Sequence, residues 1–425
     1  MNNFTFTHVL TIILCTFIAL APTISNADDQ NELLKKYPAW HQFQSDKDTM
    51  AKLHQIEAFI TKHQNKNMIA VFDWDGTLYH EKITVKQPIE LRDISKSTDL
   101  YYDFRKGSRK GVLEEAGQPT FHIWSATHAS NQTKKYKNLN LVPMRVSAKL
   151  SSKENFINVV DYDNRLEGEE VIAGKSVASI DEYNKFAQIA TFEAGMTPEN
   201  MHKAVKAYLY DYEPCQYAFF PVLDVYHRFV ETGFHVWIVT GSNPYYVKPV
   251  LQEIENKCLR TDGTKYNFEI DNKVFNPDSD RMYGNFAQVT NASKKSIVFN
   301  DMLDDTRIRP YARLFDFETN QFVDPKSDRA KQLETLDYRY INNRLGKTIT
   351  VGGYIEHKEK SQVVFIAGNS SSDQNMLEFN LSRPDTMVMG VNPHGGFGEF
   401  LASLPSARSI SLQVMSQNEH KTLTK

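Results

Sequence analysis

The stretch Val71-Phe72-Asp73-Trp74-Asp75-Gly76-Thr77-Leu78 decides the fold that this sequence predicts. It continues from residues 68–72, a short apolar run bounded by polar residues, which is typical of a strand buried on both faces. A parallel strand that ends there places Asp73 and Asp75 at the carboxyl edge of the sheet, where open α/β sheets bind ligands. Two neighbouring acids repel each other unless they share a proton or a cation, so the pattern indicates a metal site. The alternative is an acidic turn, because Asp, Gly and Thr are common turn residues.

Three further apolar runs predict the rest of the sheet. They comprise residues 236–239, 363–366 and 386–389, and a helical pattern precedes or follows each of them. Strands that alternate with helices are typical of α/β domains with a parallel sheet. We therefore predict a doubly wound α/β core.

Polar residues with possible roles in chemistry lie beside two of these runs. Thr240 and Gly241 follow residues 236–239, whereas Asn369 and Asp373 follow residues 363–366, and Lys347 lies ahead of the latter run. Each signal is weak alone. A Thr-Gly pair also caps helices, a Ser-rich loop also precedes them, and a lone lysine is usually a solvated side chain. Lys248 is the nearest competitor for the role of Lys347.

Taken together, the four segments resemble the motifs of the haloacid dehalogenase superfamily, whose first motif is DxDGT after a first strand. The resemblance implies that Asp73 is a nucleophile that forms an aspartyl-phosphate, and that Asp75 is the general acid and then the general base. It also implies that Thr240 and Gly241 bind the phosphate, while Lys347 bonds both nucleophile and phosphate. The expected activity is that of a phosphomonoester hydrolase.

The resemblance also implies a magnesium ion held by Asp73, Asp75, Asn369 and Asp373. In the phosphoserine-phosphatase-like group the fourth motif is GDxxxD, whereas this chain has Asn369 in place of the first acid. An amide oxygen still ligates magnesium but carries less charge, so we expect weaker binding or a shift of the metal toward Asp373.

The chain between the first two motifs is too long for one loop. In this superfamily an insertion there is a cap domain, often helical, that covers the site and selects the substrate. We therefore expect a helical cap at residues 83–217, a core made of residues 28–82 and 218–425, and a second insertion at about residues 259–338 with no assigned role.

The amino-terminal 27 residues are expected to be a secretory signal peptide. An apolar run at residues 9–20 precedes the small residues Ser25-Asn26-Ala27 and is shorter than a membrane-spanning helix, so we expect an exported protein without stable membrane insertion. A retained anchor is the alternative. Past this leader, Cys215 and Cys258 form one disulfide or remain two buried thiols.

Length, composition and net charge indicate which class of protein this is and which partners are disfavoured. With 425 residues, 41% of them hydrophobic, the chain can bury a sizeable core. A formal net charge of −3 provides no general field for nucleic acid, and the basic cluster at residues 105–110 is interpreted as a solvated loop.

Several functions agree with these patterns. The signal peptide, cap placement and motif style resemble exported phosphorylcholine phosphatases, so phosphocholine or a similar phosphorylated amino alcohol is the expected substrate. Trp124, Tyr101 and Tyr102 are available to hold a quaternary ammonium, although aromatic residues in a cap are more often its core. The alternatives are a broad-specificity acid phosphatase or phosphotransferase, and a non-catalytic binding or effector module on the same fold. The sequence predicts no oligomeric state.

Overall fold

The computed structural model describes residues 27–80, 214–285, 288–289, 296–298, 307–316, 318–319, 321–334 and 342–417, together with 198–199, 202 and 206. The expected signal peptide up to residue 26 and nearly all of the expected cap, with its three aromatic residues, lie outside this part of the chain. Both remain predictions.

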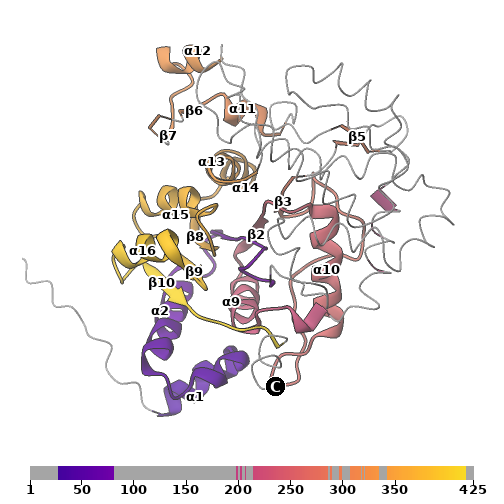
Figure 1. Ribbon diagram of the computed structural model, residues 1–425, viewed down its shortest axis with the longest axis vertical. Helices are drawn as coiled ribbons and strands as arrows, with labels where there is room; N and C mark the ends of the chain where they lie inside the picture. Colours follow the sequence, from indigo (N-terminus) through magenta and orange to yellow (C-terminus); the bar gives the residue numbers. More distant parts are fainter. Residues whose placement is uncertain are drawn as a thin grey trace, which may run out of the picture.

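A six-stranded parallel sheet forms the centre of the molecule (Figure 1). Its strands are β1 (Ile69–Phe72), β2 (His235–Val239), β3 (Met282–Tyr283), β8 (Val363–Gly368), β9 (Met387–Val391) and β10 (Ser409–Leu412). They lie in the order β10-β9-β8-β1-β2-β3, and every pair of neighbours is parallel. All four apolar runs are strands, and the predicted α/β fold is confirmed.

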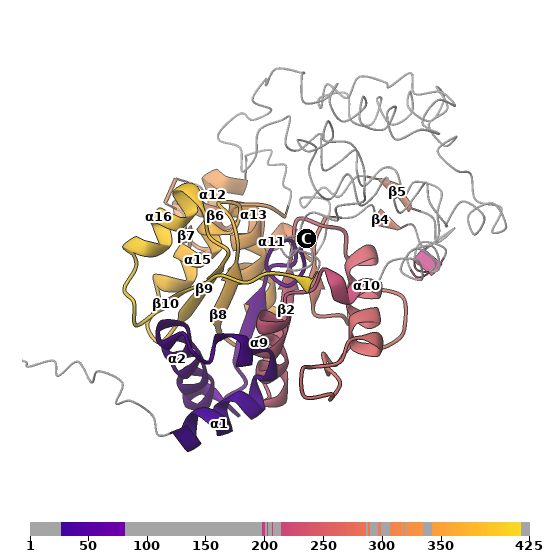
Figure 2. The ribbon, with the colours of Figure 1, turned by 60° about the horizontal axis from the view of Figure 1, so that its bottom comes forward.

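Helices cover both faces of the sheet because its strands are apolar on both sides. Ala70 and Phe72 of β1 belong to one core, and Ile69 and Val71 to the other. The first core is closed by α1 (Ala27–Lys36), η1 (Pro38–Phe43), α2 (Lys47–His63), α9 (Phe220–Glu231) and α10 (Pro244–Lys257). The second is closed by α11 (Arg309–Ala312), α12 (Asp328–Glu334), the π-helical segment η6 (Ile349–Ile355), α15 (Gln374–Leu381) and α16 (Gly395–Ser403). Figure 2 shows α2 and α9 on one side of the sheet and α15 and α16 on the other.

The order of the strands defines where a ligand can bind. The chain passes from β1 to β2 and β3 on one side, and then crosses to β8, β9 and β10 on the other. The direction of winding therefore reverses between β1 and β8. In open α/β sheets this switch point opens a crevice at the carboxyl ends of the strands.

The expected second insertion is in part continuous with the core. Met282 and Tyr283 form β3, which pairs with β2 at the edge of the main sheet. The other described strands of this region form two antiparallel pairs, β4 (Gln288–Val289) with β5 (Ser296–Val298) and β6 (Phe315–Asp316) with β7 (Gln321–Phe322).

Cys215 and Cys258 form a disulfide. Cys215 lies in η5 (Pro214–Gln216), and Cys258 caps the carboxyl end of α10. The bond therefore ties the start of the chain that follows residues 81–213 to the helix after β2. Of the two alternatives left open by the sequence, the structure shows the paired one.

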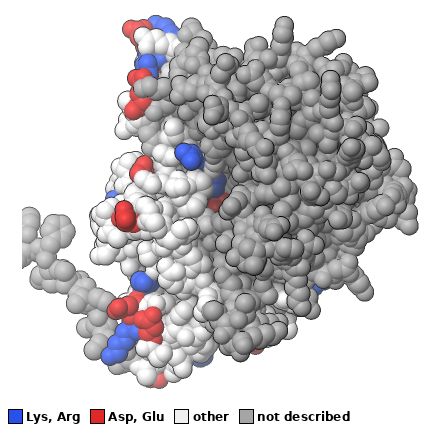
Figure 3. Space-filling view, viewed as in Figure 1, with Lys and Arg blue, Asp and Glu red and all other residues white. Residues whose placement is uncertain are grey.

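The described residues contain no helix with both the length and the apolar character needed to cross a membrane. On the face shown in Figure 3, small groups of both signs occur near α1 and near α12. Ion pairs within these helices join Lys35 to Glu32 and, at 2.8 Å, Lys331 to Asp328.

A buried carboxyl group, Asp224 of α9, holds the amino-terminal helices on the core. One oxygen accepts the N–H of Ala39 at 2.7 Å, and the other accepts from Arg260 Nε and the Tyr266 hydroxyl, both at 3.3 Å. Burial raises the pKa of Asp224 to about 7, although Arg260 and the hydrogen bonds oppose the shift. Asp224 therefore holds its proton up to a higher pH in the folded protein than in the unfolded chain, where an Asp has a pKa of about 3.9.

This proton predicts how stability depends on pH. Between about pH 4 and pH 7 the folded state binds more protons at Asp224 than the unfolded state, so its contribution to the free energy of unfolding falls as pH rises, by at most about 1.4 kcal/mol per pH unit. Asp224→Asn lacks this titration. Urea unfolding at pH 5 and pH 7 should show the wild type losing stability relative to the variant as pH rises, whereas a constant difference would contradict the shift.

Candidate active site

The first motif forms a tight turn that places both acids at the carboxyl end of β1. Asp73 directly follows the strand, and its N–H donates to the carbonyl of Ala367 in β8 at 2.9 Å. Gly76 adopts a φ of +72°, a conformation that favours glycine. The carbonyl of Trp74 accepts the N–H groups of residues 77, 78 and 79 and closes the turn. The local sequence therefore directs the chain away from the sheet immediately after the two acids.

Lys347 joins two of the predicted site carboxylates. Its ammonium lies 2.8 Å from Asp73 Oδ1 and 2.6 Å from Asp373 Oδ1, and all three side chains are buried. Lys347 lies in α13 (Leu345–Thr348), directly ahead of η6. Lys248 instead bonds Asp271 at 2.6 Å and Asp280 at 2.8 Å. Of the two candidate lysines, Lys347 is the one at Asp73.

Asp373 is held by the loop that follows β8. Its Oδ2 accepts the N–H groups of Asn369 at 2.9 Å and Ser370 at 3.2 Å. Gly368 is needed for this approach, because a Cβ there would lie 2.6 Å from the Cβ of Asp373. Both oxygens of Asp373 therefore already accept hydrogen bonds, two from the backbone and one from Lys347.

Asp75 faces the loop that follows β2. Its Oδ2 accepts the hydroxyl of Thr240 at 3.2 Å and the hydroxyl of Ser242. The Ser242 N–H donates in turn to Thr240 Oγ1 at 3.0 Å. The sequence predicted Thr240 and Gly241 but missed Ser242, since a serine in a turn ahead of a helix carries no distinctive signal.

Buried amides hold the Thr240 loop in place. Asn342 donates to the carbonyl of Thr240 at 2.7 Å, and Asn285 donates to the carbonyl of Gly241 at 2.9 Å. The loop also packs directly on the end of β3, because a Cβ on Gly284 would lie 2.2 Å from the carbonyl oxygen of Ser242. The sequence did not indicate either asparagine: Asn285 lies inside the insertion at about residues 259–338 that was left without a role, and Asn342 lies just after it.

In the part of the chain that the structure describes, this site holds more acids than cations. Lys347 bonds Asp73 and Asp373, and Asp75 lies close enough to Asp73 to raise the pKa of Asp73 further. Burial raises the pKa of Asp73 well above its usual value; the nearby Asp373 carboxylate adds to the shift and Lys347 opposes it. Burial by itself lowers the pKa of Lys347, but the carboxylates of Asp373 and Asp73 raise it above the usual range. A further cation or a proton is therefore needed before Asp73 ionises easily.

The predicted metal ligands are only partly grouped. Asp73, Asn369 and Asp373 lie at the adjacent ends of β1 and β8, and Asp75 lies two residues after Asp73. Among the described residues, no three His, Cys, Asp or Glu side chains are grouped as metal ligands would be. The carboxylates and the Asn369 amide are the oxygen donors that magnesium prefers, so the donor types fit, while the ligand set remains a prediction.

The described segments before residue 81 and after residue 213 meet beside this site. Tyr79 pairs with Ala218 in an antiparallel bridge, the His80 N–H donates to the Tyr217 carbonyl at 2.7 Å, and the Phe219 N–H donates to the Leu78 carbonyl at 3.1 Å. The chain thus leaves the core four residues after Asp75 and re-enters at the same place. These contacts hold residues 78–80 and 217–219 together near the acids.

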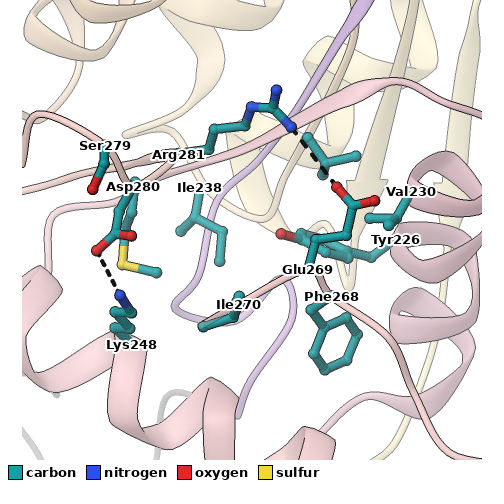
Figure 4. A pocket seen from close by; sticks show the side chains of 12 residues that line it. Tyr226, Val230, Ile238, Lys248, Phe268, Glu269, Ile270, Ser279, Asp280 and Arg281 are labelled. Carbon is teal, nitrogen blue, oxygen red and sulfur yellow. Dashed lines mark hydrogen bonds and ion pairs between the residues drawn. The ribbon is translucent and has the colours of Figure 1, made fainter. Parts of the chain in front are cut away.

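A cavity of about 200 Å³ lies elsewhere, between α9, β2 and the loop ahead of β3 (Figure 4). Tyr226, Ile238 and Phe268 are among the residues that line it, and none of the predicted site residues does. Its charged groups pair with one another, Lys248 with Asp280 and Arg281 with Glu269. The cavity is separate from the candidate active site.

Comparisons with known proteins yield no family assignment. No family model matches the sequence, and no curated protein matches it. Similar solved structures include a conserved protein of unknown function from Anaerococcus prevotii DSM 20548, which is 13% identical, with 86% of this chain and 94% of that chain covered and a TM-score of 0.42. Another is cytosolic 5'-nucleotidase IIIB bound to cytidine, which is 11% identical, with 92% and 94% covered and a TM-score of 0.35. Neither likeness is close enough to carry an argument about activity.

Proposed function

We propose that this chain is a phosphomonoester hydrolase of the haloacid dehalogenase type with Asp73 as its nucleophile. The observation that carries the proposal is the buried Lys347, which bonds Asp73 and Asp373 at the switch point of a parallel sheet. A purely structural ion pair has no need for two further features of this site. They are a third acid, Asp75, close to Asp73, and the hydroxyl groups of Thr240 and Ser242 that face Asp75.

The proposal gives each residue the role that the resemblance of the motifs implies. Asp73 attacks phosphorus, so that a bond forms between its carboxylate oxygen and phosphorus while the bond to the leaving oxygen breaks. Asp75 gives its proton to that leaving oxygen. Water then attacks the aspartyl-phosphate, Asp75 accepts a proton from the water, and inorganic phosphate leaves with Asp73 restored. Lys347 and the Thr240 hydroxyl stabilise the charge on the phosphoryl oxygens.

A magnesium ion fits the charge of this site. Asp73, the Asn369 amide and either Asp75 or Asp373 would hold it through oxygen. When bound, the ion supplies positive charge that neutralises the acids and the phosphoryl group. Both oxygens of Asp373 already accept hydrogen bonds. We therefore favour a role for Asp373 in orienting Lys347 over a role as a metal ligand.

This proposal predicts a phosphatase activity that depends on a divalent cation. Purified protein should hydrolyse a small aryl phosphate in the presence of magnesium. The rate should fall at least about 100-fold when a chelator is added and should recover when magnesium is restored. The physical reason is that the acids and a phosphate dianion share one pocket only with a counter-charge. Full activity in chelator, with metal analysis showing none bound, would contradict the magnesium assignment. Inactivity on every phosphomonoester of a broad panel would instead favour a non-catalytic module.

For the substrate and the location we propose phosphocholine, or a similar phosphorylated amino alcohol, and a compartment outside the cytoplasm. The Cys215–Cys258 disulfide supports export, because disulfides persist mainly in oxidising compartments. The proposed substrate rests on the resemblance to exported phosphorylcholine phosphatases in signal peptide, cap placement and motif style. Choline phosphate should be cleaved faster than uncharged esters in the same panel, and competition by added alcohols would reveal phosphotransfer.

A further inference from the structure

We infer that Asn342 is a positioning residue, one that fixes the phosphate-binding Thr240 loop relative to Lys347. The inference rests on the proposed function for its catalytic meaning, but its structural part stands on hydrogen bonds alone. Asn342 is fully buried, and it lies five residues ahead of Lys347 at the switch point.

The side chain of Asn342 joins three separate elements. Its Nδ2 donates to the carbonyl of Thr240 at 2.7 Å and to the carbonyl of Tyr283 at 3.2 Å, at the carboxyl ends of β2 and β3. Its Oδ1 accepts the hydroxyl of Thr350 in η6 at 2.9 Å. Every polar atom of the amide is therefore used, and only an amide offers donors and an acceptor in this arrangement.

The backbone around Asn342 completes the connection. Its N–H donates to Asn285 Oδ1 at 2.8 Å, and Asn285 Nδ2 holds the Gly241 carbonyl. Two residues later, the Arg344 N–H donates to the carbonyl of Ser372 at 3.0 Å, in the loop that holds Asp373. The segment that leads to Lys347 is thus bonded to the second motif on one side and to the fourth on the other.

These contacts have a consequence for catalysis. The Thr240 hydroxyl and the Lys347 ammonium must converge on the same phosphoryl group, yet the loop that carries Thr240 and the helix α13 that carries Lys347 are more than 100 residues apart in the chain. Displacing a positioning group by about 1 Å can lower a rate by about 100-fold. Asn342 bonds directly to the residue that carries the hydroxyl and to the helical segment that follows the lysine.

The chain offers a matched control in Asn380. It is equally buried, and its Nδ2 also donates to two strand carbonyls, those of Val364 at 3.3 Å and Met387 at 3.2 Å. These carbonyls lie at the amino ends of β8 and β9, on the edge of the sheet opposite the site. Asn380 therefore has the same kind of bonding, but the side-chain hydrogen bonds given for it do not reach any of the predicted site residues.

The experiment compares Asn342→Leu with Asn380→Leu, since leucine keeps nearly the same volume without polar atoms or charge. Both variants should melt at lower temperature than the wild type. Where both are folded, Asn342→Leu should lower kcat about 100-fold and weaken inhibition by orthovanadate, a mimic of the transferring phosphoryl group, at least about tenfold. Asn380→Leu should change either value by less than about threefold. Wild-type values in Asn342→Leu, or equal losses in both variants, would overturn the inference.

Hydrogen exchange separates this inference from the proposed function. Residues 240–243 and 344–350 should exchange faster in Asn342→Leu than in the wild type, and this is measurable even if the protein hydrolyses no phosphomonoester. If exchange is faster in the variant but the wild type hydrolyses no phosphomonoester, the role of Asn342 in holding the Thr240 loop is supported and the proposed phosphatase activity is rejected. Unchanged exchange would reject the link. If Asn342→Leu does not fold, Thr350→Val removes one donor to the same amide, and wild-type exchange and kcat in that variant would reject the link equally.

Discussion

Replacing Asp73 by Asn is expected to lower turnover at least about 1,000-fold and to raise the free energy of unfolding in metal-free buffer. Turnover is lost because an amide cannot form the aspartyl-phosphate. Stability rises because the neutral side chain avoids the cost of burying a charge near Asp373, the cost that raises the pKa of Asp73. Initial rates and urea unfolding in chelator measure the two effects.

A matched control for this variant is Asp316→Asn. Asp316 is also a buried acid at a strand end, in β6, but Arg329 bonds both of its oxygens and lowers its pKa. Its replacement should lower stability and preserve turnover. With magnesium present, the stability gained by Asp73→Asn should shrink, since a bound cation stabilises the wild type. If the Asp73→Asn variant retained substantial turnover, Asp73 would not be the nucleophile.

Replacing Lys347 by Met should have the largest effect on stability. It leaves Asp73 and Asp373 buried without their shared ammonium, and removing one partner of a buried ion pair typically costs about 3–5 kcal/mol. Turnover should also fall, because the ammonium that bonds both the nucleophile and the phosphate in the proposed mechanism is lost. Chemical unfolding at several pH values measures the first effect. The deficit should shrink at low pH, where the acids take up protons.

Two comparisons make this prediction specific. The double variant Lys347→Met with Asp73→Asn should regain part of the lost stability, since one of the uncompensated acids is then neutral. Lys248→Met removes an equally buried lysine that also bonds two acids, so it should destabilise the protein but leave kcat unchanged wherever it is folded. If the changes in the free energy of unfolding of the two single variants simply add in the double variant, Lys347 does not compensate the charge of Asp73.

The sequence predicted the parts of the site that lie within one segment. The strand before Asp73 and the strand before Asn369 were visible as apolar runs, and their parallel ends imply a shared edge. Lys347 was identified through a resemblance, and the structure shows its bonds to Asp73 and Asp373. The choice between Lys347 and Lys248 required three-dimensional contacts.

What the sequence could not predict depends on contacts between distant segments. Asn342 and Asn285 lie in stretches without a periodic pattern, and their role arises only when β2, β3 and η6 meet. The pairing of Cys215 with Cys258 was undecided for the same reason. β3 was missed because a two-residue strand leaves no apolar run.

The disulfide has a consequence for the unfolded chain. Cys215 and Cys258 are 43 residues apart, and the chain between them contains α9, β2, the Thr240 loop and α10. These elements form a covalent ring that persists after the native contacts are lost. Closing a ring of this size lowers the entropy of the denatured ensemble by an amount worth about 4 kcal/mol in the chain-entropy model. The ring also means that a single proteolytic cut inside it leaves both fragments joined until a reductant is added.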